Sequence, residues 1–443
     1  MPYTTATAVD RPRLADELTS RLDALAAAHQ VPGAQLAVDT GSQVITWHTG
    51  LADAATATPF TADTAVPLGS LTKPYTAAAV LLLAEDGDLD LDDPVAEHLP
   101  ELRALPAVTV RQLLSHTAGL PSGPDSDTAA GTTRAHYLAR ACAPDELLFD
   151  PGTDFSYSNA GYVAAGHLVA AVTGMEWAEA LRVLLLDPLG TVPAVLGGPV
   201  RRALAGGHAV NTASGELRPA RQNLAPAEAP AGALLASAVD LMVFGRALAG
   251  RSEVLPPAVA DLLRTVEPAA GPSALADGWG PGLAAYRTAG PTWYGHDGNA
   301  QGTSCHLRIE PVSGLVVAFT GNAGAATALW RDVAAELARF TGRPVPATVP
   351  AARRGPGVPL PESAGRYRNG GTEYLVATGP DGSPTLSVDG DLPLPLRCYP
   401  DLSCDLVDPD SGLLQAGGGF RRDPAGGAID RLQISGRTAR RVS

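Results

Sequence analysis

The sequence predicts a mixed α/β (α+β) domain followed by a small all-β module. Two observations support the first domain: helix and strand patterns occur near its start and again near its end, and a mostly helical stretch lies between them. This order is typical of a sheet whose strands come from both ends of one segment, with helices packed against it. A third observation sets off the module, because a proline-rich stretch precedes short alternating segments.

The spacing of apolar residues defines the first elements. A packing helix is expected over Arg11–His29, with leucines recurring on one face. Two strands follow, over Ala34–Asp39 and Gln43–His48, and a Gly-Ser turn joins them. A long apolar helix then begins at Ser70 and runs to about Asp86.

Helices dominate the middle of the first domain, and strands return after Gly278. Ser237 and Asp240 stand in the pattern of a capping box, which predicts the start of a helix that ends near Leu248. The other expected elements are the helices Tyr162–Val172 and Ala178–Leu186, the strands Leu283–Arg287, Thr303–Ile309 and Leu315–Thr320, and a closing helix Ala325–Phe340.

Prolines mark the boundary between the two folded units. Six of them lie between Thr341 and Ser363, which is typical of a semi-stiff linker. The expected division is a first domain over residues 1–342, the linker over 343–363 and the all-β module over 364–443. Alternating segments in the module, typical of a small barrel or sandwich, are Tyr374–Thr378, Thr385–Asp389 and Ile429–Ile434.

The composition excludes several classes of function. A formal net charge of −14 argues against nucleic acid as a partner, because phosphate binding needs a basic surface. No stretch approaches the ~20 apolar residues of a membrane-spanning helix, so no membrane partner is expected. Met1–Asp10 lacks the basic and apolar regions of a secretory signal, so we expect a cytoplasmic protein.

Neither a metal nor another cofactor is expected. No cluster of His, Asp and Glu has ligand spacing, and the cysteine spacings match no zinc pattern. The four cysteines fit reduced thiols, although Cys398 and Cys404 are close enough in sequence to form a pair. The sequence does not indicate an oligomeric state.

Lys73 is the one lysine of the chain; the remaining basic residues are arginines. Arginine serves almost every surface purpose of lysine, so a single lysine indicates a task that arginine cannot perform. That task is the loss of a proton, because a guanidinium stays charged in proteins whereas a desolvated ammonium becomes a neutral base.

Ser70 lies three residues before Lys73 in Ser70-Leu71-Thr72-Lys73. Residues i and i+3 share one face of a helix, so the amine is within reach of the hydroxyl. At a helix start, free backbone N–H groups also favour an anion. We therefore predict that Ser70 is a nucleophile and Lys73 its proton acceptor. The alternative is a chance S-x-x-K pattern with a solvated lysine.

Three short motifs occur in order: PLGSLTK at residues 67–73, FSYSN at 155–159 and GHDG at 295–298. They resemble the three motifs of the class C-like branch of the serine β-lactamase and penicillin-binding-protein superfamily, and the resemblance covers about residues 10–342. It implies an antiparallel sheet flanked by helices with an all-helical subdomain. The all-β module resembles the lipocalin-like barrel that follows the catalytic domain in penicillin-binding-protein-type thioesterases.

The resemblance also implies roles for the other motif residues. Tyr157 would share a proton with Ser70 and Lys73, with phenolate character beside an ammonium. Asn159 would donate to a substrate carbonyl. His296, on an edge strand facing the serine, would polarise Tyr157 or bind a substrate carboxylate or amide.

The third motif supplies the expected oxyanion hole. The backbone N–H groups of Ser70 and of Asn299, which follows Gly298, would bind the oxyanion. A histidine in place of the lysine of Lys-Thr-Gly disfavours antibiotic hydrolysis, because it holds a carboxylate less firmly.

Each motif residue also has a simpler interpretation. Tyr157 fits a packing tyrosine, Asn159 a helix cap, and His296 a surface imidazole in a glycine-rich turn. His116, in a further stretch similar to this branch, is interpreted as structural, satisfying backbone groups of a loop.

The expected substrate follows from the resemblance. The thioesterases take a nonribosomal peptide, bound to a carrier protein and usually ending in a D-residue, and cyclise it head to tail. We therefore expect a peptidyl thioester or ester to acylate Ser70 and to leave by intramolecular aminolysis. The alternative is a soluble serine hydrolase, either an esterase or a D-aminopeptidase. A third hypothesis is a catalytically idle scaffold whose module binds a carrier domain.

Overall fold

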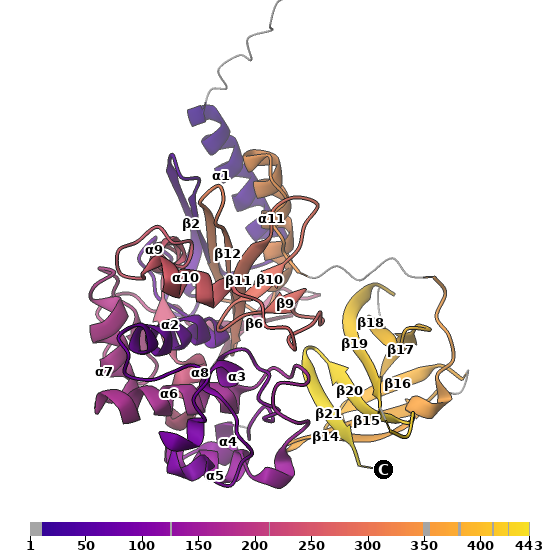
Figure 1. Ribbon diagram of the computed structural model, residues 1–443. Helices are drawn as coiled ribbons and strands as arrows, with labels where there is room; N and C mark the ends of the chain where they lie inside the picture. The colour runs from indigo at the N-terminus through magenta and orange to yellow at the C-terminus, as the bar shows by residue number, and fades with distance from the viewer. Residues whose placement is uncertain are drawn as a thin grey trace, which may run out of the picture.

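The computed structural model describes residues 11–124, 126–211, 213–348, 355–379, 382–409, 412–423 and 425–442. Met1–Asp10 and residues 349–354 of the expected linker lie outside this part of the chain. The described residues form a mixed helix and sheet domain beside a separate barrel (Figure 1). No helix in these ranges has the length and apolar character needed to cross a membrane.

An antiparallel sheet of eight strands is the centre of the first domain. Its order is β3-β2-β1-β13-β12-β11-β10-β9, so β1 from the chain start pairs with β13 from the domain end. The predicted assembly from both ends is confirmed. The strands are β1 Gly33–Asp39, β2 Val44–Asp53, β3 Thr58–Pro59, β9 Gly278–Trp279, β10 Ala284–Tyr286, β11 Trp293–Ala300, β12 Thr303–Glu310 and β13 Leu315–Gly321.

Helices cover both faces of this sheet (Figure 1). α1 (Arg11–Ala28) and α11 (Ala326–Thr341) pack together on one face, and α9 (Ala238–Leu248) packs on the other. The predicted capping box opens α9, with the Ser237 and Asp240 side chains each bonded to the other's backbone N–H. This contact fixes the start of the helix.

The remaining elements build a helical layer and two minor sheets. The helices are α3 Val110–Leu114, α4 Ser126–Ala129, α5 Arg134–Ala141, α6 Asn159–Thr173, α7 Trp177–Leu181, α8 Ala229–Gly232 and α10 Pro257–Arg264. The minor strands are β4 Val66–Pro67, β5 Ala194–Val195, β6 Gly207–Asn211, β7 Glu216–Ala220 and β8 Leu234–Ala236.

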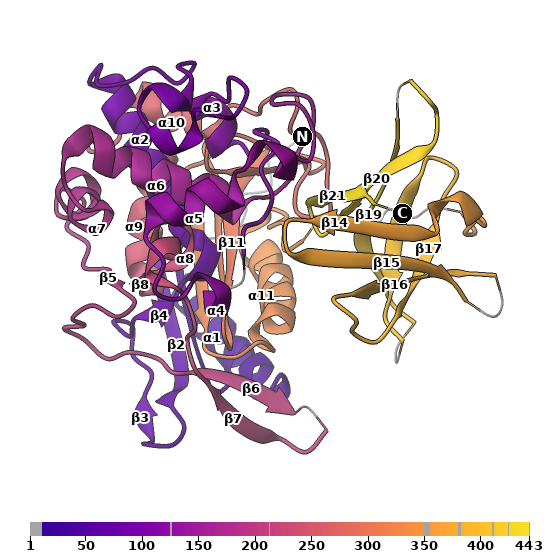
Figure 2. The ribbon, with the colours of Figure 1, turned by 90° about the horizontal axis from the view of Figure 1, so that it is seen from below.

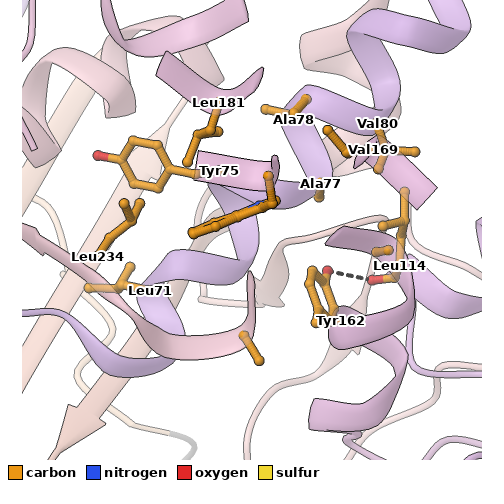
Figure 3. Close-up of a cluster of buried hydrophobic side chains, with 14 of the residues drawn as sticks. Leu71, Tyr75, Ala77, Ala78, Val80, Leu114, Tyr162, Val169, Leu181 and Leu234 are labelled. Carbon is orange, nitrogen blue, oxygen red and sulfur yellow. Dashed lines mark hydrogen bonds between the residues drawn. The ribbon is translucent and has the colours of Figure 1, made fainter. Parts of the chain in front are cut away.

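The helix that follows Ser70 runs through the middle of this layer. It opens as a 3₁₀ turn, Gly69–Leu71, and continues as α2, Thr72–Glu85. Its side chains are buried on all sides, as Figure 3 shows for the cluster around Tyr75. A helix apolar all round needs a complete shell of partners, and α6, α8 and α10 are among the helices that supply it.

Two local predictions differ from the structure. The helix expected over Ala178–Leu186 divides into α7 and a π-helical turn at Arg182–Leu186. The strand that carries His296, β11, is an inner strand and not an edge strand, because the short strands β10 and β9 extend the sheet beyond it.

The C-terminal module is a closed antiparallel barrel in which each strand pairs with the next and β14 pairs with β21. This up-and-down order is that of a lipocalin-like barrel, as predicted. Cys398 and Cys404 face each other across β17 and β18, and both side chains are buried. The strands are β14 Gly365–Asn369, β15 Thr372–Thr378, β16 Pro384–Val388, β17 Leu394–Cys398, β18 Ser403–Val407, β19 Leu414–Arg422, β20 Ile429–Ile434 and β21 Arg437–Arg441.

The barrel docks on the first domain through the turn between β20 and β21 (Figure 2). The backbone N–H of Tyr157 donates to the carbonyl of Gly436 at 2.9 Å. The Thr438 hydroxyl donates to the carbonyl of Phe155 at 2.9 Å, and the Thr438 N–H donates to the Ser156 hydroxyl at 3.1 Å. The segment that carries Tyr157 is therefore held by the barrel.

A Thr438→Val substitution keeps the shape of this contact and removes its hydroxyl. We expect the free energy of unfolding to fall by about 1 kcal/mol, the usual worth of one hydrogen bond, in a urea titration. Thr385→Val is the matched control, because the Thr385 hydroxyl bonds within the barrel, to Ala377. Catalytic activity should fall in the Thr438 variant alone; equal losses in both variants would contradict the coupling to Tyr157.

Candidate active site

The S-x-x-K motif forms a direct contact. Lys73 Nζ lies 3.1 Å from Ser70 Oγ and donates a second hydrogen bond to the carbonyl of Ala231 at 2.8 Å. The contact predicted from the i, i+3 spacing is confirmed. With one N–H directed at Ala231, a neutral amine has its lone pair available for the serine proton.

Burial decides the charge of Lys73. Its side chain is 0% exposed, and this burial holds the pKa of Lys73 well below the ordinary 10.5. The positive charge of Arg437 lowers this pKa further, while the carboxylate of Glu228 opposes the shift. The alternative of a solvated lysine is wrong, and the balance of these effects favours a neutral amine.

Tyr157 lies beside the same amine, with Lys73 Nζ 5.0 Å from the centre of its ring. Burial raises the pKa of Tyr157, although a hydrogen bond with Ser70 and the charge of Arg437 act in the opposite direction. The raised pKa favours a neutral phenol over the phenolate that the resemblance implies. The Tyr157 hydroxyl is therefore protonated before the reaction begins, and it can relay a proton during the reaction.

His296 faces Tyr157 from β11 and is 2% exposed, so the surface alternative is wrong. Its Nδ1 lies 2.5 Å from the Asp297 carbonyl, which only accepts, so Nδ1 carries the proton. Nε2 is then the acceptor, 3.5 Å from the Tyr157 hydroxyl. Burial lowers the pKa of His296 to about 3, which keeps the ring neutral.

Asp297 points to the opposite face of the sheet, as the alternation of a strand requires. It accepts from His306 Nδ1 at 2.7 Å and pairs with Arg308, also at 2.7 Å. Burial raises the pKa of Asp297, but the charges and hydrogen bonds of Arg308 and His306 outweigh this and lower it overall. This ion pair holds β11 from the face of the sheet opposite His296.

Two glycines allow β11 to approach the turn that carries Ser70. A Cβ on Gly298 would lie 2.0 Å from the Leu68 carbonyl oxygen, and one on Gly69, at φ +53°, would lie 2.2 Å from that of Asn299. No other residue fits either position without moving the backbone. The approach brings the backbone of Asn299 next to that of Ser70, where the oxyanion hole is expected.

Ser70, Asn159 and Asn299 line one cleft of about 290 Å³. Asn159 is the first residue of α6, and Ser158 is its cap, because the Ser158 side chain accepts from the Gly161 N–H. The helix-cap interpretation of Asn159 is therefore wrong. The Asn159 amide is placed to reach a group bound next to Ser70.

His116 supports this site from outside it. Its Nδ1 accepts from the Ser158 N–H at 3.0 Å, and its ring packs 4.3 Å from that of Tyr157. The structural interpretation of His116 is confirmed. In the described ranges, no group of three or more His, Cys, Asp or Glu side chains is arranged to hold a metal ion.

Arg437 belongs to the site but carries no sequence motif. It lies at the start of β21, and its guanidinium carbon is 5.2 Å from the centre of the Tyr157 ring. The barrel thus places a fixed positive charge over the tyrosine that faces Lys73. A pattern search does not find this residue, because nothing in the sequence pairs an arginine of β21 with a tyrosine of the first domain.

The Beta-lactamase family profile matches residues 18–339, well over half of the chain. The chain belongs to the β-lactamase and penicillin-binding-protein superfamily. Penicillin-binding protein 4 of Amycolatopsis lactamdurans is 35% identical over 338 residues, which cover 72% of this chain and 87% of that protein. A β-lactamase-type serine hydrolase or transferase is therefore the class of this enzyme.

Solved structures of this superfamily extend the comparison to the barrel. The crystal structure of SurE is 36% identical, with a TM-score of 0.86 over 98% of this chain and 100% of SurE. The structure of SurE with D-Leu is also 36% identical, with a TM-score of 0.82 over 97% of this chain and 100% of that one. A D-stereospecific amidohydrolase from Streptomyces is 27% identical, with a TM-score of 0.56 over 72% of this chain and 97% of the amidohydrolase.

Arg437→Gln tests the influence of the barrel on this β-lactamase-type site. A base that must be neutral loses activity as the pH falls through its pKa, and Arg437 lowers the pKa of Lys73. Removing the charge should move the acidic limb of kcat/KM to higher pH. Arg397→Gln, on the barrel strand β17, is the control with the same loss of charge. An unchanged limb in Arg437→Gln would contradict the electrostatic role.

Proposed function

We propose that the protein is a serine acyltransferase that takes a peptidyl thioester or ester onto Ser70 and releases it as a head-to-tail cyclic peptide. The observation that carries the acyl-enzyme chemistry is the 3.1 Å contact between Ser70 Oγ and the buried amine of Lys73. The acyl donor is expected to be bound to a carrier protein and to end in a D-residue.

In the first half-reaction, Ser70 Oγ attacks the carbonyl carbon and its proton passes to Lys73 Nζ. The N–H groups of Ser70 and Asn299 stabilise the oxyanion, and Asn159 donates to a substrate carbonyl. The bond to the leaving sulfur or oxygen then breaks, and Tyr157 delivers a proton to it while Lys73 replaces that proton. His296 Nε2 accepts from the Tyr157 hydroxyl and keeps it oriented between these steps.

In the second half-reaction, the N-terminal amine of the same peptide attacks the acyl carbon. The bond from that carbon to Ser70 Oγ breaks, and the proton lost by the amine returns to Oγ through Tyr157 and Lys73. Water could take the place of the amine, because the same base activates either nucleophile.

Three observations favour the peptide cyclase. The chain is similar to SurE over 98% of its length, including the barrel, and SurE has been crystallised with D-Leu. The barrel resembles that of the penicillin-binding-protein-type thioesterases. His296 is neutral, so it does not offer the charge that would hold the carboxylate of a β-lactam.

A second candidate is a hydrolase that acts on D-configured peptides or amides. The D-stereospecific amidohydrolase from Streptomyces supports it, since it shares 27% identity with this chain. The two functions share the acyl-enzyme and differ in the acceptor, so the products distinguish them.

The proton-acceptor role of Lys73 predicts that Lys73→Arg is almost as damaging as Lys73→Ala. Arginine keeps its proton, so both variants should lose at least about a hundredfold in kcat, the lower end of what general base catalysis contributes. Acylation is followed by mass spectrometry with a peptidyl thioester, which should add mass to Ser70 but not to Ser70→Ala. A near-normal rate with arginine would reject this role for Lys73.

A peptidyl thioester mimic that ends in a D-residue tests the cyclase. We expect cyclic product from this substrate and at least about tenfold slower thiol release from its L-epimer, which a stereospecific pocket would place poorly. The products are separated by liquid chromatography and identified by mass. Linear acid alone, or a preference for simple esters, would favour the hydrolase.

A further inference from the structure

The cleft next to Ser70 contains a carboxylate that the acyl-enzyme mechanism does not use. Glu228 lines this cleft and is 4% exposed. Among the described residues that line it, Glu228 is the charged one; the others are apolar residues, glycines, serines and amides. A buried carboxylate in a cleft that also holds a nucleophile favours a cationic ligand over a neutral or anionic one.

A short stretch of backbone connects Glu228 to Ala231, a hydrogen-bond partner of the catalytic amine. Glu228 ends the 3₁₀ turn Pro226–Glu228, and α8 begins at the next residue. The carbonyl of Ala231, in that helix, accepts from Lys73 at 2.8 Å. The carboxylate is near enough for its charge to act on Lys73. A group held by Glu228 is therefore close to the acyl-enzyme.

Neighbouring elements hold the carboxylate and the outer rim of the cleft. The Ser126 hydroxyl of α4 donates to Glu228. At the rim, Gln222 donates to the Gln301 carbonyl at 2.6 Å, and Asn223 donates to Asp127 at 2.8 Å. The rim contacts are made by side-chain amides, and Asp127 does not line the cleft. Among the described residues that line the cleft, Glu228 is thus the one that brings a charge to it.

We propose that Glu228 binds the primary ammonium group of the acceptor end of the peptide and holds it beside the Ser70 acyl-enzyme. This assignment rests on the proposed function, because it requires an amine acceptor. The bound ammonium loses one proton to water, and its nitrogen then attacks the acyl carbon. The bond between that carbon and Ser70 Oγ breaks, and the second proton passes through Tyr157 and Lys73 to Oγ.

The test compares two peptidyl thioesters that differ only in the N-terminus, one with a free amine and one acetylated. Glu228→Gln should lower kcat/KM for the free-amine peptide roughly ten- to a hundredfold, the worth of a hydrogen bond to a charged group. Any change in the pKa of Lys73 affects both substrates equally, so it cancels in the ratio of the two kcat/KM values. Asp127→Asn removes a nearby charge outside the cleft and should leave this ratio unchanged.

An unchanged ratio would overturn the proposal, whether both peptides lose activity equally or neither loses any. A second pair of substrates, a D-aminoacyl ester with a free or an acetylated α-amine, identifies the source of the ammonium. If Glu228→Gln affects this pair alone, the carboxylate binds the acyl residue and the acceptor assignment is wrong. If the wild type forms only linear acid, the cyclase proposal fails, while the ratio still reports on Glu228.

Inhibition of the wild-type enzyme provides a measurement that does not depend on a folded variant. Peptide amides that are not substrates are used as competitors, again with a free or an acetylated N-terminus. The free amine should inhibit about tenfold more strongly, the lower end of the same range. Equal inhibition would overturn the ammonium site.

Discussion

The chemistry of this enzyme depends on one buried amine, that of Lys73. Keeping a charge on Lys73 in the interior is costly, so burial lowers the pKa of its amine well below the ordinary value. The same burial requires polar partners for the amine: the Ala231 carbonyl accepts one N–H, and Ser70 Oγ lies 3.1 Å from Nζ. An arginine in this position would keep its charge and could not accept the serine proton. The helical layer around α2 therefore contributes to the chemistry, because it buries Lys73.

The other half of the site depends on how closely two backbones approach. Gly69 and Gly298 let the serine turn meet β11 at distances that a Cβ would forbid. The ion pair of Asp297 with Arg308 holds the strand from the far side of the sheet. Such close contacts leave the two backbones little room to shift, and N–H groups that are already in place stabilise a developing negative charge better than groups that must move into place.

Much of this could be predicted from the sequence, because the responsible patterns are local. The Ser70 and Lys73 contact follows from helical spacing, and the barrel follows from alternating segments after a proline-rich stretch. Prediction failed for features that depend on contacts between distant parts of the chain. The protonation of Tyr157 depends on burial, the inner position of β11 depends on two very short strands, and Arg437 and Glu228 come from segments without a motif.

The position of Arg437 has a consequence for biosynthesis. The chain is made from its N-terminus, so the serine, the lysine and the tyrosine leave the ribosome long before β21. The turn that bonds Tyr157 is the hairpin turn between β20 and β21, so it forms only when the last barrel strand pairs with the strand before it. A nascent or truncated chain that lacks β21 therefore contains Ser70, Lys73 and Tyr157 without the Arg437 guanidinium that lies over the tyrosine ring.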